Sequence, residues 1–282
     1  MKVTIKNSNF TATINSKGAE LISLKTNGRE YIWEGNPEFW GKHSPVLFPI
    51  VGTLKNNEFQ YLEENYTLSR HGFARDIEFV VKEQSENKVV FSLESSASTL
   101  QNYPFIFELQ LIYVLEESKL TIQYKVFNKD SKEIPFSIGA HPAFALTENF
   151  DSYSLSFGDD NELKYFLLEN DLLSDKTEVI DLNKNQLQLD YQLFERDALV
   201  FKQINSKAIT INENSKPILK IDFKNFPNLG IWTKNKAPFI CIEPWFGYSD
   251  TNNSSGNILE KEGIIILKTN EIFDCEFSIE IK

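Results

Sequence analysis

The chain has 282 residues, of which 41% are hydrophobic, and a formal net charge of −11 at pH 7. An acidic surface repels phosphate backbones and anionic lipid, which disfavours binding to nucleic acid or to a membrane surface. No stretch approaches the ~20 apolar residues of a membrane span, and the first residues alternate in polarity where a signal peptide has an apolar core. We therefore expect a cytoplasmic protein, monomer or homodimer, whose partner is a small neutral molecule.

Polar and apolar residues alternate along most of the chain, as they do in half-buried strands. Aromatic residues make up 13% of the chain, with 23 phenylalanines, and such residues favour pleated surfaces. Windows of helical period are scarce, so the sequence predicts an all-β protein. In chain order the clearest predicted strands are Phe10–Ile14, Ile77–Val81, Val89–Leu93, Leu120–Val126, Ile134–Ile138, Ile218–Phe223 and Gly263–Leu267.

Polar turns separate the predicted strands at the spacing of antiparallel meanders, and no composition break resembles a linker. A single open sheet of about twenty strands would leave long edges and one apolar face exposed, so two or more large sheets should pack face to face. The sequence therefore predicts one domain over residues 1–282, built as a large antiparallel β-sandwich.

Histidine is the first candidate for chemistry, because its pKa lies nearest neutrality and the chain has only three. His71 lies in the loop-like segment Ser69–Arg75, which also holds two of the four arginines. His141 follows a predicted strand in the turn Gly139–Pro142, and strand-end loops are where β scaffolds place functional groups. Taken alone, a histidine is more often a hydrogen-bonded structural or surface group than a catalyst, and His43 is interpreted in that way.

Glu243 is the third candidate, because it ends the apolar segment that begins at Phe239 and is held between Ile242 and Pro244. Partial burial would raise its pKa towards that of a useful general base, and the neighbouring Trp245 could stack on the C–H face of a sugar. The alternative is an ordinary strand-end glutamate paired with a lysine.

Other chemistries lack their signatures, since the motifs GxGxxG, GxxxxGK[ST], GxSxG and HExxH are all absent. The loop Asp250–Gly256 resembles a calcium loop, but its glycine is at position 7 and no glutamate occupies position 12. We expect no metal there. Cys241 and Cys275 lie in apolar segments without CxxC spacing and are interpreted as buried, reduced thiols.

Several of these segments occur in an order that points to one family. Together they resemble the aldose 1-epimerase family, specifically its short bacterial LacX-like branch, and the resemblance covers essentially the whole chain. The segments are Pro45–Gly52, Arg70–Arg75, Pro135–Phe144, Phe194–Phe201 and Cys241–Gly247.

The resemblance implies a galactose mutarotase-like supersandwich and an isomerase that interconverts the α and β anomers of an aldohexose such as galactose or glucose. By motif, Glu243 is similar to the general base of the family and His141 to its general acid. His71 is similar to a second active-site histidine, which acts on the ring oxygen. Asp197, in an Arg-Asp-Ala-Leu motif, is similar to a carboxylate that holds sugar hydroxyls. Further substrate contacts are expected from Arg70, Arg75 and Trp245.

The chemistry implied in this way is ring opening, in which O1 loses a proton while O5 gains one, followed by rotation and reclosure on the other face. A base and an acid on opposite sides suffice for it. No metal, nucleotide or other cofactor is therefore expected.

One position departs from the pattern of the branch. Its members carry an arginine after the Val-Gly pair, where this chain has Thr53, with Lys55 two residues on. Two alternatives stay open: a hexose 6-phosphate 1-epimerase, in which Arg70, Arg75 or Lys55 holds the phosphate, and a non-catalytic carbohydrate-binding module on the same fold.

Overall fold

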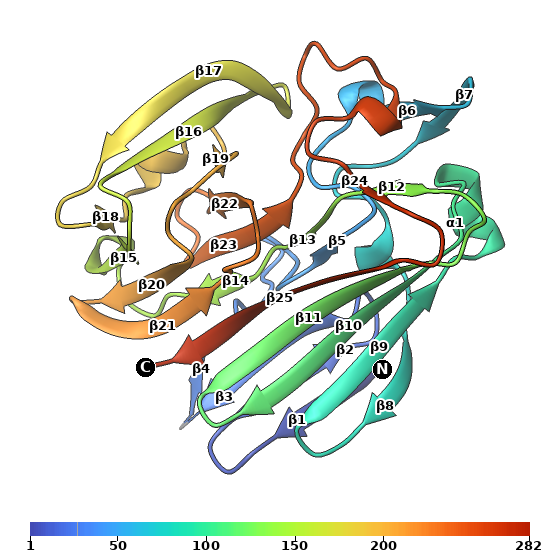
Figure 1. Cartoon of the computed structure of the whole chain (residues 1–282). Coiled ribbons are helices and arrows are strands. Elements are labelled where there is room, and N and C mark those ends of the chain that lie inside the picture. Colours follow the sequence, from blue (N-terminus) through green and yellow to red (C-terminus); the bar gives the residue numbers. More distant parts are fainter. Residues whose placement is uncertain (27) are drawn as a thin grey trace.

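The structure, a computed structural model, describes residues 1–26 and 28–282. Strands β1–β25 make up most of these residues, which confirms the all-β prediction (Figure 1). The described helices are short: α1 (Ala97–Asn102) and the 3-10 helices η1 (Lys55–Asn57), η2 (Ala74–Asp76), η3 (Phe150–Ser152), η4 (Tyr191–Phe194) and η5 (Ile258–Glu260). Within this part of the chain, none of the helices has the length and apolar character needed to cross a bilayer.

The first large sheet has nine strands, and neighbouring strands in it are antiparallel. The sheet runs across the lower half of Figure 1, and its long central strands β11 and β25 come from distant parts of the chain. In spatial order the strands are β18 (Gln186–Gln188), β15 (Tyr153–Phe157), β20 (Ala208–Glu213), β21 (Lys216–Asp222), β25 (Ile272–Ile281), β11 (Lys119–Asn128), β10 (Phe107–Glu116), β9 (Lys88–Glu94) and β8 (Val80–Gln84).

The second large sheet has eight strands and is also antiparallel. Its central strand is β23, which pairs with β22 on one side and with both β13 and β14 on the other. The strands are β17 (Leu172–Asp181), β16 (Glu162–Glu169), β19 (Leu199–Phe201), β22 (Asn228–Trp232), β23 (Phe239–Phe246), β13 (Ile138–Ala140), β5 (Val46–Leu47) and β14 (Ala143–Ala145).

Three smaller sheets complete the described fold. The four-stranded sheet is formed by β1 (Lys2–Lys6), β2 (Thr11–Asn15), β3 (Glu20–Thr26) and β4 (Arg29–Glu30). The two-stranded sheets pair β6 (Glu58–Tyr61) with β7 (Glu64–Thr67), and β12 (Ile134–Phe136) with β24 (Ile265–Leu267).

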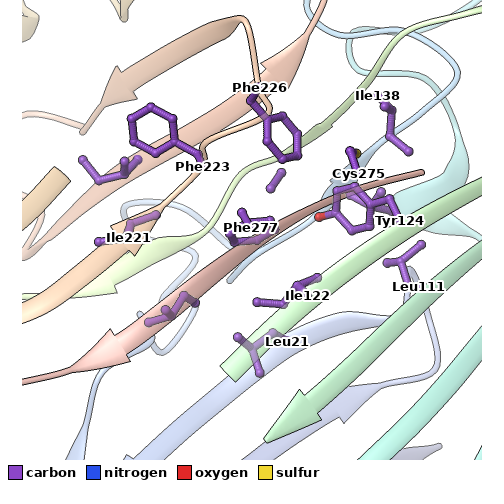
Figure 2. Packing of buried hydrophobic residues seen from close by; sticks show 14 of the residues in the cluster. Leu21, Leu111, Ile122, Tyr124, Ile138, Ile221, Phe223, Phe226, Cys275 and Phe277 are labelled. Carbon is purple, nitrogen blue, oxygen red and sulfur yellow. The ribbon is translucent and has the colours of Figure 1, made fainter. Parts of the chain in front are cut away.

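The hydrophobic core joins residues of both large sheets and of the four-stranded sheet in one cluster. Figure 2 shows Ile122 and Tyr124 of β11 beside Phe277 of β25, with Ile138 of β13 and Leu21 of β3 in the same region. Burying apolar side chains between facing sheets is the main stabilising contribution in such a sandwich. The predicted sandwich architecture is therefore confirmed.

Two predicted strands differ from the observed ones where the backbone bonds elsewhere. The strand expected at Ile77 begins only at Val80, because the Ile77 N–H bonds Ala74 O and closes η2. The strand expected over Ile134–Ile138 divides into β12 and β13 at Ser137, whose N–H donates to Pro49 O at 2.8 Å. This break carries the chain from the small sheet into the eight-stranded sheet beside β23, just before His141.

Candidate active site

A cavity of about 580 Å³ opens on the eight-stranded sheet. Its volume lies in the range of small-molecule sites, about 300–1,000 Å³. All seven side chains that the sequence singled out line this cavity, although they come from four separate segments. They are Arg70, His71, Arg75, His141, Asp197, Glu243 and Trp245.

Strand β23 sends alternate side chains to opposite faces of its sheet, as the pleat requires. Ile240 and Ile242 belong to the main core, whereas Glu243 and Trp245 face the cavity. Glu243 pairs in register with Gly230 of β22, and the indole of Trp245 packs against this glycine. The carboxylate is buried, at 2% exposure, and still borders the cavity.

His141 faces Glu243 because of strand register. Gly139 of β13 pairs with Trp245 and Ala143 of β14 pairs with Cys241, so the connection between β13 and β14 lies opposite Glu243. The imidazole Nε2 of His141 is 3.4 Å from Oε2 of Glu243. Two groups that lie about one hundred residues apart in the sequence are thus in direct contact.

His71 is fixed by Gly52, a residue of the loop after β5. The His71 N–H donates to Gly52 O at 2.8 Å, and the Gly52 N–H donates to His71 Nδ1 at 3.1 Å. His71 has φ +68°, a left-handed conformation that is uncommon for residues other than glycine. A neutral imidazole that accepts at Nδ1 carries its proton on Nε2. Arg70 Nε lies 3.3 Å from Nε2. Because a neutral imidazole has only one acceptor nitrogen, Nε2 cannot accept from Arg70 while Nδ1 accepts from Gly52.

Trp40 and Trp232 are two lining residues that the sequence interpretation missed, although it named Trp245. Trp40 stacks on the His141 ring at 4.7 Å between centroids and 24° between planes. Trp232 meets the same ring edge-on at 5.8 Å. A usable signal existed, because the chain has only four tryptophans, and three of them, including Trp245, line the cavity.

Burial shifts the protonation of the three central groups, because charge is costly in a low-dielectric site. It raises the pKa of Glu243 well above its usual value, against the opposing charge of Arg70. Burial, together with Arg70 and Arg75, lowers the pKa of His141 to about 3. Burial, His141 and the same arginines lower the pKa of His71 well below its usual value. Both imidazoles are therefore neutral at pH 7.

The charged rim of the cavity is formed around Arg70. Its Nη1 donates to Asp171 at 2.8 Å, and its Nη2 lies 4.0 Å from Oδ2 of Asp197. Arg75 Nη2 donates to the backbone oxygen of Arg70 at 2.7 Å. Asp197 is partly exposed, has φ +79° and lines the cavity.

Three other positions considered from the sequence do not line the cavity. The Thr53 N–H donates to Ser249 Oγ at 3.0 Å, and Lys55 Nζ donates to Asn252 O at 2.8 Å. Because Lys55 lies elsewhere, it is not placed to hold a substrate phosphate. His43 is 3.9 Å from a carboxylate oxygen of Glu20.

Metal-ligand geometry occurs once in the described ranges, 1–26 and 28–282. One ligand atom each of His141, Cys241 and Glu243 lies within 4.8 Å of the others. The loop from Asp250 to Gly256 shows no such group; the Asp250 carboxylate bonds Lys261 Nζ at 2.9 Å and the Lys55 N–H at 2.9 Å. Cys241 and Cys275 are both buried and free, in line with their interpretation as reduced thiols.

The packed antiparallel sheets and the cavity with its carboxylate and two histidines define a galactose mutarotase-like β-sandwich. The chain belongs to the aldose 1-epimerase family, because the model of that family matches residues 1–279. The resemblance inferred from the five short segments is therefore confirmed.

Individual relatives agree with this assignment. The chain is 38% identical over 277 residues to the chromosomal protein LacX of Lactococcus lactis subsp. lactis, covering 92% of each chain. A galactose mutarotase related enzyme from Lactobacillus acidophilus superimposes with a TM-score of 0.95 at 30% identity, covering 100% of this chain and 97% of that one. A galactose mutarotase-like protein from Lactobacillus casei gives 0.92 at 31% identity, with full coverage of both chains.

Proposed function

We propose that the protein is a cofactor-independent aldose 1-epimerase that interconverts the α and β anomers of an aldohexose by ring opening and reclosure. The observation that carries the proposal is the contact of Glu243 with His141 at the wall of a sugar-sized cavity, with His71 beside them. Glu243 acts as the general base and His141 as the general acid.

One proton shared by Glu243 and His141 is enough to provide both the general base and the general acid. In the free site burial keeps this proton on the carboxyl group, since the pKa of Glu243 is raised and that of His141 is lowered. Its transfer across the 3.4 Å contact gives a carboxylate and an imidazolium. The carboxylate takes the proton of O1 while the imidazolium protonates O5, and the C1–O5 bond breaks. Reclosure after rotation about C1–C2 reverses both transfers, so the pair is regenerated.

The contact between the two groups suits the substrate, because O1 and O5 are bonded to the same carbon. An acid and a base side by side can reach both oxygens at once. Positioned proton transfer of this kind typically contributes about 10²- to 10⁴-fold to a rate.

His71 supports the ring oxygen. With Nδ1 occupied by the Gly52 N–H, the proton is on Nε2, and Arg70 Nε lies 3.3 Å from it. We assign both N–H groups as donors to an oxygen of the bound sugar. The His71 and His141 rings are 5.7 Å apart and meet edge-on, so one oxygen can lie near both. A donated hydrogen bond stabilises the charge that develops on O5 as its bond to C1 breaks.

The remaining lining residues suit a sugar. Trp40, Trp232 and Trp245 offer aromatic surface to C–H faces, and Asp197 offers a carboxylate to hydroxyl groups. Thr53, the single sequence feature that pointed to a non-catalytic module, lies outside the cavity lining and so does not favour that alternative.

A phosphorylated hexose is the second candidate substrate, favoured by the presence of Arg70, Arg75 and Lys234 around the cavity. Guanidinium groups bind phosphate well. Arg70 is already paired with Asp171, however, and Asp197 contributes a negative charge to the same rim. The neutral hexose is therefore the first choice.

Polarimetry tests the proposal. Freshly dissolved α-glucose, α-galactose and α-glucose 6-phosphate are followed with enzyme and with buffer alone. We expect acceleration with at least one neutral hexose; acceleration with the phosphate ester alone would transfer the assignment to the second candidate. No acceleration of any of the three would remove the epimerase proposal.

A further inference from the structure

The side chains around Glu243 include one that the epimerase chemistry does not use. Cys241 lies two residues before Glu243 on β23 and faces the same side of the sheet. It is fully buried, behind the cavity wall, in a cluster with Trp33, Ala143 and Phe239. Its thiol is nevertheless within reach of the catalytic pair, since one ligand atom each of His141, Cys241 and Glu243 lies within 4.8 Å of the others.

We propose that His141, Cys241 and Glu243 form an inhibitory binding site for a thiophilic divalent cation such as Zn²⁺. Binding itself does not depend on the proposed epimerase function, whereas the inhibition rests on it. A bound cation would occupy both the base and the acid.

The distances fit a tetrahedral ion. With bonds of about 2.0–2.2 Å to nitrogen and oxygen and about 2.3 Å to sulfur, neighbouring ligand atoms lie about 3.3–3.6 Å apart. The Nε2 to Oε2 separation of His141 and Glu243 is already 3.4 Å. The ligand atoms lie within 4.8 Å of one another, so the thiol has to approach by up to about 1.2 Å. The fourth position is left for water or a sugar hydroxyl.

A buried carboxylate oxygen without a hydrogen-bond partner among the described residues lies at the proposed cation site. Oε2 of Glu243 is buried and, although His141 Nε2 lies 3.4 Å away, it makes no hydrogen bond within residues 1–26 and 28–282. A buried polar atom without a partner costs free energy that a ligand can recover.

The donor set selects the class of ion. A thiolate, an imidazole and a carboxylate suit Zn²⁺ and related soft or borderline cations, whereas Mg²⁺ and Ca²⁺ prefer oxygen ligands alone. Thiolate and carboxylate together balance the two positive charges of the ion, as a buried site requires. The thiol binds such an ion as its thiolate, so binding releases the thiol proton.

The test is titration of the metal-free protein with Co²⁺, whose thiolate charge-transfer absorption reports sulfur ligation. We expect one equivalent to bind to the wild type with this absorption, and Zn²⁺ to displace it. Cys241→Ser and Cys241→Ala should lose the absorption and bind at least tenfold more weakly. Cys275→Ser is the matched control, because Cys275 is the other buried cysteine and lies on β25. Thermal unfolding verifies that each variant is folded.

Two outcomes would overturn the site: no thiolate absorption in the wild type, or absorption that persists in both Cys241 variants. Mutarotation gives a separate readout. Zn²⁺ should inhibit the wild type and Cys275→Ser, with recovery on chelation, and should leave Cys241→Ala active. If the protein accelerates no mutarotation, the Co²⁺ titration still decides whether the cation binds, so the two proposals fail independently.

Discussion

Gly52 and His71 bond each other twice, through the His71 N–H to Gly52 O and through the Gly52 N–H to His71 Nδ1. The first bond fixes the backbone of the loop, and the second fixes the imidazole. Together they hold a left-handed histidine and leave its Nε2 for the cavity. The Val-Gly pair of the family segment therefore acts on the site through His71, and Gly52 itself also lines the cavity.

Two replacements of His71 separate its contribution to catalysis from its contribution to stability. Asparagine tolerates the left-handed region and its Oδ1 can accept from Gly52, so His71→Asn should fold with a melting temperature near that of the wild type. It lacks Nε2–H, and kcat/KM should fall about 10²-fold or more. His71→Ala should also lose stability, by about 1–3 kcal/mol, because the buried Gly52 N–H loses its acceptor. Wild-type turnover in His71→Asn would show that the imidazole is dispensable.

Glu243→Gln tests the base and its burial in one variant. Turnover should fall about 10²- to 10⁴-fold, with the fold retained. Burial raises the pKa of Glu243 in the folded state. Above the ordinary pKa of a glutamate, the unfolded chain has therefore lost a proton that the folded protein still holds. The free energy of unfolding consequently falls as the pH rises. Glutamine does not titrate, so its variant does not lose stability in this way as the pH rises. The variant should therefore melt higher than the wild type at pH 7 to 8, with the difference vanishing near pH 4.

The control for that experiment is Glu64→Gln, at an exposed position of β7. It should change neither turnover nor the pH dependence of the melting temperature. Equal melting temperatures of Glu243→Gln and the wild type across this range would contradict the buried, protonated carboxyl group.

The pH profile of kcat/KM should reflect the single proton shared by Glu243 and His141. An ordinary histidine would produce a limb near pH 6.5. Burial, Arg70 and Arg75 lower the pKa of His141 to about 3, so a second proton enters the pair only in strong acid. After subtraction of the spontaneous rate, kcat/KM should therefore show no limb at the ordinary pKa of a histidine. A limb centred near 6.5 would show that an unperturbed imidazole controls the rate.

The sequence predicted the fold well because strand signals are local. Alternation identified the strands around Val89–Leu93 and Leu120–Val126 nearly to their ends. The alternation did not predict the break at Ser137, where a hydrogen bond to the distant Pro49 divides one predicted strand into two. Local pattern carries no information about such a partner.

The candidate site was predictable in its residues but not in its geometry. Motif order indicated Glu243, His141 and His71, and all three line one cavity. The expected arrangement had the base and acid on opposite sides, whereas Glu243 and His141 are in contact. That contact results from the register of β13 and β14 on β23, which no local pattern specifies. The stacking of Trp40 on His141 is equally a product of tertiary packing.

Lys261 and Asp250 form a buried ion pair behind the cavity wall. Lys261 Nζ donates to Asp250 Oδ1 at 2.9 Å and to Tyr248 O at 2.6 Å, and Tyr248 lines the cavity. Lys261→Met should lower the free energy of unfolding by about 3–5 kcal/mol, because it leaves a carboxylate buried without its partner. In a denaturant-unfolding cycle, Lys261→Met combined with Asp250→Leu should cost less than the sum of the single changes. Additive costs would mean that the pair is not coupled.

Gly230 shapes the cavity by having no side chain. A Cβ placed there would lie 2.4 Å from Cη2 of Trp245, so Gly230→Ala must displace the indole from its place beside Glu243. Overpacking of this kind costs about 1–3 kcal/mol, and the shifted ring should raise KM or lower kcat for the sugar. Gly158→Ala is the matched control, since a Cβ there meets nothing within 4 Å. Thermal unfolding and polarimetry on both variants decide the matter: if Gly230→Ala behaves like Gly158→Ala, the position of Trp245 does not matter for turnover, and the aromatic contact assigned to it is wrong.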